Sequence, residues 1–207
     1  MTEVPVSRFA AILIVLMVLS GCAGSKPANY YVLYSIQNPV PQVRAAGTEQ
    51  DLAIGVGPIK IPDYLDRPQM AARSGGSGLQ FAEFDKWAEP LEKNLTRVLA
   101  DNLSILVPTE RVSVFPWARA VPVRYQVTVE IVQLEKMPDE KVILDARWNI
   151  LENDGGKLLV MKRSKFTLPV ESAGFEGVAS AESRAVDALS RDIAAALGSL
   201  PSEPPSR

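Results

Sequence analysis

Residues 123–134, which read VRYQVTVEIVQL, decide the fold of this chain together with the two segments that follow them. Apolar and polar side chains alternate along this stretch, as they do in a β-strand that is buried on one face. A turn at 137–140 leads to a second strand over 142–151, and the sequence NDGG at 153–156 is a hairpin signal before a third strand over 157–170. Three consecutive strands joined by short turns predict an antiparallel meander.

Two other segments have the period of an amphipathic helix. Over 87–107 and again over 175–197, apolar residues recur three and four positions apart. Pro108 ends the first segment, and the many alanines of the second allow a helix to lie close to a sheet. Shorter strands are expected over 30–34, 52–61 and 111–115, with a hairpin of 69–73 and 79–84 around the turn sequence SGGSG. We therefore predict a single α+β domain: a mainly antiparallel curved sheet with two amphipathic helices packed on it.

Gly55 and Gly57 form only a Gly-x-Gly pair. A dinucleotide-binding loop needs a third glycine and a following helix, and this stretch of the sequence has neither. We expect the two glycines to serve a bulge or a close approach of another segment to the backbone. Trp87, Trp117 and Trp148 are most simply interpreted as residues of the core or of its edge.

The N-terminus has the form of a bacterial lipoprotein signal. Arg8 precedes the apolar run 9–19, and the run ends in LSGC at 19–22, which matches the lipobox read by lipoprotein signal peptidase. The run is shorter than the roughly 18 residues of a membrane-spanning helix, so it predicts a tether and not a span. We expect a signal peptide (1–21), a lipid-bearing tether (22–29, with the lipid on Cys22), a folded domain (30–197) and a disordered, proline-containing tail (198–207).

Ala23 gives a hint about location. In enterobacterial-type lipoproteins, an aspartate directly after the lipid-bearing cysteine tends to retain the protein in the inner membrane. Ala23 and Gly24 carry no such signal. The expected location is therefore the periplasmic face of the outer membrane.

Composition argues against catalysis and against binding of nucleic acid. Lys and Arg total 22 and Asp and Glu total 24, so the net charge is −2 and there is no basic excess. Histidine is absent and Cys22 is the only cysteine, which removes the commonest general base, metal ligand and thiol nucleophile. Four acids (Asp63, Asp66, Glu83 and Asp85) lie close in sequence but match no metal-binding or catalytic spacing. We predict no enzyme, no metal and no cofactor beyond a covalent lipid, with a carboxylate hydrolase as the rival hypothesis.

The segment 62–68, PDYLDRP, is a loop framed by prolines. It could display Tyr64 and Leu65 to a partner, because displayed apolar residues mark interaction surfaces. Alternatively, Tyr64 and Leu65 cover the edge of the core while the charged residues are solvated. The sequence leaves these two possibilities open.

Four stretches together resemble a known family. They are Cys22 with YYVL at 30–33, IGVGPIKIPDYLDRPQ at 54–69, AEFDKWAEPL at 82–91, and FPW at 115–117. The family is that of the ABC-type transport auxiliary lipoproteins of the PqiC/YmbA kind, and the resemblance extends over essentially all of 22–197. It implies a non-enzymatic outer-membrane lipoprotein that supports envelope integrity. Cys22 is the one functional residue that can be carried over.

The resemblance also implies partners. The family works with inner-membrane MCE-domain proteins and their transporter or permease, which form lipid-conducting tunnels across the periplasm. A family member would receive or seal the outer end of the tunnel, and a ring of copies would suit that docking. We expect Tyr64, Leu65, Arg67, Phe84 and Trp87 to face neighbours or the tunnel. A structural or pilot lipoprotein that assists another envelope complex, such as a secretin, is the alternative.

Overall fold

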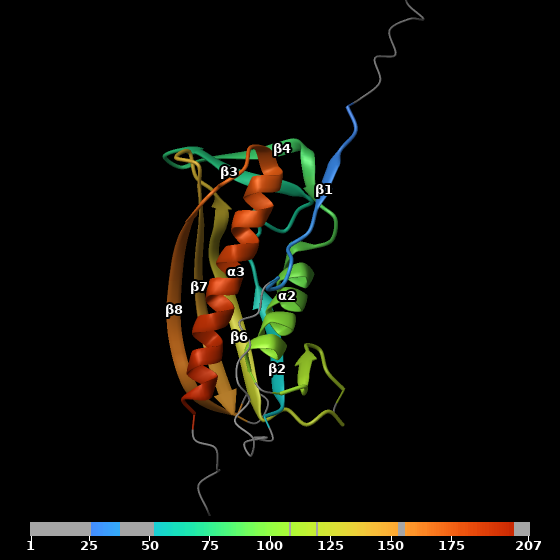
Figure 1. Ribbon diagram of the computed structural model, residues 1–207, viewed down its shortest axis with the longest axis vertical. Helices are drawn as coiled ribbons and strands as arrows, with labels where there is room; N and C mark the ends of the chain where they lie inside the picture. The colour runs from blue at the N-terminus through green and yellow to red at the C-terminus, as the bar shows by residue number, and fades with distance from the viewer. Residues whose placement is uncertain (1–25, 38–51, 108, 119, 153–155, 201–207) are drawn as a thin grey trace, which may run out of the picture.

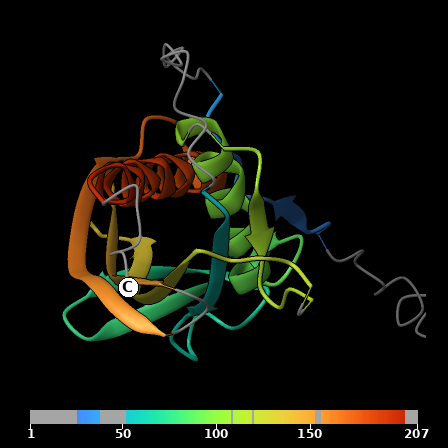
Figure 2. The same cartoon turned by 90° about the horizontal axis from the view of Figure 1, so that it is seen from below.

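The computed structural model describes residues 26–37, 52–107, 109–118, 120–152 and 156–200. One sheet of eight strands curls around two helices, α2 (Leu91–Leu106) and α3 (Gly174–Gly198), which lie together on its concave side (Figure 1, Figure 2). The strands are β1 (Asn29–Tyr31), β2 (Ile54–Lys60), β3 (Gln69–Gly75), β4 (Gly78–Trp87), β5 (Val112–Val114), β6 (Tyr125–Lys136), β7 (Lys141–Glu152) and β8 (Lys157–Pro169). The predicted single α+β domain is confirmed.

The predicted meander forms the long half of the sheet. β6 pairs with β7 and β7 pairs with β8, both antiparallel, with Trp148 opposite Val129 on one side and Lys162 on the other. Val129 and Trp148 are buried, as are the other alternate apolar residues of β6 and β7. The period-two pattern of the sequence therefore identified the face that packs on the helices.

Parallel pairing completes the sheet and was not predicted. β2 lies between β6 and β5 and is parallel to both, and β1 is parallel to β4. After β2 the chain forms the β3–β4 hairpin and α2 before it returns as β5, which is a connection long enough for a parallel neighbour. The sheet is therefore mixed, although the meander and the hairpin are antiparallel.

The first helix begins later than the sequence pattern indicated. Trp87 is the last residue of β4, where it pairs with Tyr31 of β1, and the helix starts at Leu91 after Pro90. The spacing of Trp87 to Leu91 fits a helix, but Trp87 reaches the core from a strand, so this boundary was wrong. The second helix agrees with its predicted range to within one residue at each end.

One core lies between the sheet and the helices. It joins apolar side chains of α2 and α3 to the concave face of β2, β6 and β7, and its largest fully buried side chain is Trp148. None of the helices in the described part of the chain is long and apolar enough to cross a membrane. The predicted signal peptide, Cys22 and the last residues of the predicted tail (201–207) lie outside the described residues.

Candidate functional site

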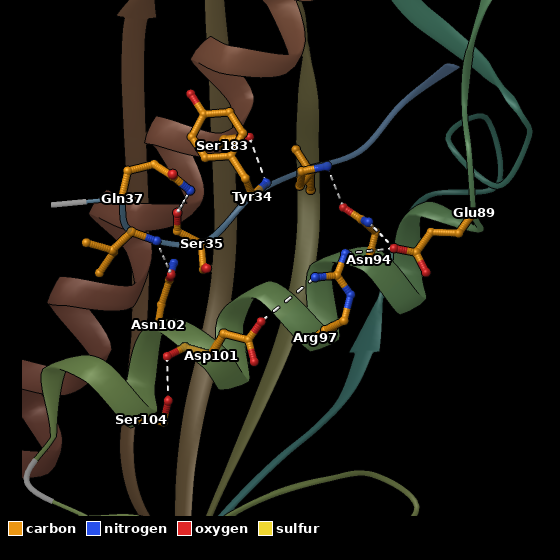
Figure 3. A network of polar contacts seen from close by, with 12 residues as sticks. Tyr34, Ser35, Gln37, Glu89, Asn94, Arg97, Asp101, Asn102, Ser104 and Ser183 are labelled. Carbon is orange, nitrogen blue, oxygen red and sulfur yellow. Dashed lines mark hydrogen bonds and ion pairs between the residues drawn. The ribbon is translucent and has the colours of Figure 1, made fainter. Parts of the chain in front are cut away.

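The chain that follows the predicted tether is bound across both helices. We call residues 32–37 the strap (Figure 3). Its backbone amides donate hydrogen bonds to helix side chains: Leu33 N to Asn94 Oδ1 (2.8 Å), Tyr34 N to Ser183 Oγ (3.2 Å) and Ile36 N to Asn102 Oδ1 (2.9 Å). The acceptors belong to α2 and α3, so the strap connects the two helices on the side away from the sheet.

The spacing of the two asparagines matches an extended chain. Asn94 and Asn102 are eight residues apart on α2, which is a rise of about 12 Å. Leu33 and Ile36 are three residues apart, which is about 10 Å of extended chain. Asn102 Nδ2 also donates to Ser190 Oγ of α3 at 2.9 Å, so one amide joins the strap and both helices. Asn102 is 0% exposed, and its polar atoms have partners in the strap and in α3.

The segment just before the strap is fixed to the sheet. Asn29 Nδ2 and Tyr31 Oη both donate to Asp85 Oδ1 of β4, each at 2.9 Å. Burial and the hydrogen bond to Asp85 raise the pKa of Tyr31. Asp85, one of the four acids considered for catalysis, thus holds the N-terminal segment in place.

The five residues predicted for an interface are divided by the structure. Leu65 and Trp87 belong to the core, with 4% and 6% of their surfaces exposed. Arg67 is exposed, and its guanidinium carbon lies 4.0 Å from the centroid of the Phe81 ring. Phe84 is half-buried, beneath the ammonium of Lys26. Arg67 is the most accessible of the five in the single chain, and the interface role of the set stays a prediction.

Tyr64 belongs to a buried polar cluster. Its hydroxyl donates to Glu135 Oε2 (2.7 Å), and Arg73 Nε donates to Glu135 Oε1 (2.6 Å). Burial and then Glu135 raise the pKa of Tyr64. Glu182 of α3 is buried, and its Oε2 has no hydrogen-bond partner among the described residues. Burial and then the carboxylate of Glu135 raise the pKa of Glu182 well above its usual value, which favours its protonated form.

A pocket of about 290 Å³ opens where β7, β8 and α3 meet. Inside it, Trp148 Nε1 donates to Ser164 Oγ (2.9 Å), and Ser164 Oγ donates to Asp192 Oδ2 (2.8 Å). At its rim, Arg163 makes two hydrogen bonds to Asp145 at 2.8 and 2.7 Å and thereby lowers the pKa of that carboxyl. These polar groups bind one another, and the chain of hydrogen bonds locks β8 onto α3.

The close approach expected at Gly55 and Gly57 is confirmed. A Cβ atom on Gly55 would lie 2.7 Å from the Trp117 ring, and one on Gly57, whose φ is +117°, would lie 2.8 Å from Phe115 Cβ. The rings of Phe115 and Trp117 meet edge to face, with centroids 5.3 Å apart. The glycines therefore make room for the FPW segment, whose first ring remains 45% exposed. The glycine pair indicated this packing, but the exposed ring was not predicted as a site.

Within the residues that the structure describes, no group of three or more Asp, Glu, His or Cys side chains is arranged to hold a metal ion. Asp63, Asp66 and Glu83 are exposed on the loop before β3 and on β4.

Comparison with known proteins places the chain in a family. The sequence model described as the ABC-type transport auxiliary lipoprotein component matches residues 34–194. The chain belongs to this family. The match begins within the strap and ends in the last turns of α3, so it includes α2, most of α3 and the whole sheet except β1.

A curated relative and two solved structures agree with this membership. The chain is 28% identical to the intermembrane transport lipoprotein PqiC of Escherichia coli strain K12. The alignment extends over 142 residues and covers 68% of this chain and 72% of that protein. The crystal structure of an uncharacterised protein has a TM-score of 0.68 at 18% identity, over 83% of this chain and 99% of the other. The structure of a Xanthomonas campestris protein has a TM-score of 0.64 at 15% identity, over 81% of this chain and 93% of the other. The two structures show the shared fold, and the family is one of transport auxiliary lipoproteins.

Proposed function

We propose that this chain is a lipid-anchored accessory subunit of an MCE-type lipid transport system. Cys22 carries the lipid, including a palmitate-type acyl chain, at the periplasmic face of the outer membrane. The domain docks at the outer end of a periplasm-spanning tunnel built by an inner-membrane MCE-domain protein and its permease. Copies of the chain form a ring there, act without catalysis or cofactor, and support envelope integrity. The family description and the name of the relative PqiC support the part of this proposal that makes the chain a lipoprotein of a transport system.

The observation that carries the proposal is the way in which the N-terminal segment joins the domain. Only six residues lie between Cys22 and Asn29, the first residue of β1, and the seven Cα–Cα steps between them can span at most about 25 Å. From Asn29 onward the chain is bonded to β4 and then to both helices. A lipid on Cys22 would therefore hold the rigid domain within a short distance of the bilayer, which suits a subunit that must meet a partner at the membrane.

The test is an affinity purification of the native lipoprotein from crosslinked cell envelopes, followed by mass spectrometry. We expect an MCE-domain protein and its permease to be recovered with the wild type and to be depleted with Cys22→Ser, which lacks the lipid attachment site. Recovery of a secretin in place of the MCE-domain protein would favour the pilot-lipoprotein alternative. Recovery of neither partner would contradict the proposal.

A further inference from the structure

The N-terminal segment presents a row of apolar side chains on its outer side. Tyr30, Val32 and Tyr34 are 64%, 48% and 37% exposed, and we call these three residues the exposed row. The residues between them face the other way: the Tyr31 hydroxyl donates to a carboxylate of β4, and Leu33 is buried in the core. Residues two apart in an extended chain lie on the same side, about 7 Å from each other, so the exposed row is continuous.

The exposed row is held in shape by the rest of the domain. Tyr30 lies in β1, which pairs with β4, and the amides of Leu33 and Tyr34 donate to side chains of α2 and α3 (Figure 3). Tyr34 Oη also shares a hydrogen bond of 2.8 Å with Ser180 Oγ of α3. Side chains on a fixed backbone lose less conformational entropy on binding than those of a loose segment, so even a small surface can contribute to a contact.

Two lysines lie beside the exposed row, on the side of the sheet. Tyr30 pairs with Lys86 of β4, and paired residues lie on the same face of a sheet. The ammonium of Lys26 lies over the ring of Phe84, 5.7 Å from its centroid, and Phe84 is two residues from Lys86 on the same face of β4. An acid of α3, Glu176, lies close to β1, so the positive charge of this surface is modest and its apolar side chains must carry most of any contact.

We propose that the exposed row rests on the lipid–water interface of the bilayer that holds the anchor, as a second contact between the domain and that membrane. This inference rests on the part of the proposed function that places a lipid on Cys22, and it adds the face of the domain that meets the bilayer. The exposed row begins at the second residue of β1, and the eight Cα–Cα steps from Cys22 to Tyr30 span at most about 29 Å. A lipid on Cys22 would therefore bring the bilayer within reach of this surface.

The side chains suit an interface between lipid and water. Tyrosine combines an apolar ring with a polar hydroxyl and is enriched at membrane interfaces, and lysine ammonium groups attract anionic headgroups. The anchor makes the second contact intramolecular, so the exposed row needs no strong affinity of its own. In this arrangement the strap lies between the bilayer and the two helices, which fixes the orientation of the domain as well as its distance from the membrane.

The experiment measures whether single positions of the domain enter the bilayer. The full-length lipoprotein is reconstituted in vesicles of phosphatidylethanolamine and phosphatidylglycerol, with an environment-sensitive fluorophore on the new thiol of the Val32→Cys variant. Cys22 is the only cysteine of the chain and would carry the lipid, so the fluorophore has one site. The matched control is Met161→Cys on β8, where the side chain is 71% exposed. Ser164 faces α3, so Met161, three residues away in the strand, lies on the convex face.

We expect the emission of the label at position 32 to shift to the blue and to be quenched by a nitroxide on the lipid acyl chains. The label at position 161 should show neither change. A second variant combines Val32→Asp with the label on Tyr30→Cys. It should shift the equilibrium between docked and undocked domain at least about 10-fold toward the undocked state, because the interface loses a valine and gains a charge.

Equal quenching at positions 32 and 161, or no quenching at position 32, would overturn the inference. A blue shift at position 32 without quenching by the lipid would also overturn it, because a second copy of the chain or another protein would then cover the exposed row. So would quenching at position 30 that Val32→Asp leaves unchanged.

The outcome is separable from that of the envelope purification. If the inference fails, recovery of the MCE-domain protein with the wild-type lipoprotein would leave the proposed function standing. If quenching is confined to position 32 and no MCE-domain protein is recovered, the inference stands and the proposed partner is wrong. If Cys22 carries no lipid, the proposed anchor and the inference fail together.

Discussion

Asn102 offers the sharpest test of how the strap is held. Replacing it with alanine removes the acceptor of the Ile36 amide and the donor to Ser190 Oγ, at a side chain that is 0% exposed. Each buried polar group left without a partner costs about 1 kcal/mol or more, and the small cavity adds about 1 kcal/mol. Ser190 keeps its hydrogen bond to Val186 O, which limits its share of the loss. We therefore expect Asn102→Ala to lower the free energy of unfolding by about 2–4 kcal/mol.

The assay is urea unfolding of the full-length protein in detergent, combined with hydrogen exchange of the strap. Asn149→Ala is the matched control, because Asn149 is only half-buried and makes one long hydrogen bond, 3.2 Å, to Thr128 Oγ1. We expect the control to cost less than about 1 kcal/mol. In the Asn102→Ala variant, hydrogen exchange of the Ile36 amide should become faster than the loss of global stability alone would make it. Exchange of the β7 amides should change only by the amount that the loss of global stability explains.

Two results would refute this reasoning. One is a loss of stability in Asn102→Ala that is no larger than that in Asn149→Ala. The other is unchanged protection of the Ile36 amide, which would mean that the remaining contacts of the strap hold it without Asn102.

Three further predictions concern a buried acid, a glycine and the anchor. Folding raises the pKa of Glu182 above the usual 4.5, so the free energy of unfolding of the wild type should fall as the pH rises above about 4.5. In urea unfolding, Glu182→Gln should lose less of this free energy between pH 5 and pH 8 than the wild type does. The same pH dependence of unfolding free energy in both proteins would contradict this. Gly57→Ala should destabilise the protein by about 1–3 kcal/mol in thermal melts, because its φ is +117° and Phe115 occupies the space, whereas Gly198→Ala, with open space around it, should be nearly neutral. Cys22→Ser should abolish labelling of the protein by an alkyne fatty acid fed to the cells, because the thiol that takes up the lipid is gone; a variant that is still labelled would argue against lipidation at this residue.

The meander could be predicted from the sequence because its information is local. Strands 125–136, 141–152 and 157–169 follow one another through short turns, so alternation and turn residues determine both their order and their direction. The parallel partners of β2 could not be predicted in the same way. β2 pairs with segments that follow it only after a hairpin and a helix. The periodicity of a strand predicts which of its faces is buried, but it does not predict which distant strand lies beside it.

The candidate site shows the same limit. Leu65 stands between two acids in a proline-framed loop, yet it is buried, because whether such a loop displays or covers an apolar residue depends on what lies beneath it. Asn94 and Asn102 fall within an apolar stripe of α2, where polar residues are unexpected; their role became visible only when the strap was seen to need hydrogen-bond acceptors. A buried asparagine on an apolar face is therefore a signal that another segment crosses there.

The strap also determines how the domain responds to mechanical force. A pull on a lipid at Cys22 enters the domain at Asn29 and runs along the chain toward Ile36. The three amides that bind Asn94, Ser183 and Asn102 lie one after another along this line, and their acceptors sit on both helices. The load is therefore resisted in shear by several bonds together, instead of opening them one at a time. When the two membranes move relative to each other, the helix pair and the sheet behind it would move as one body with the anchor.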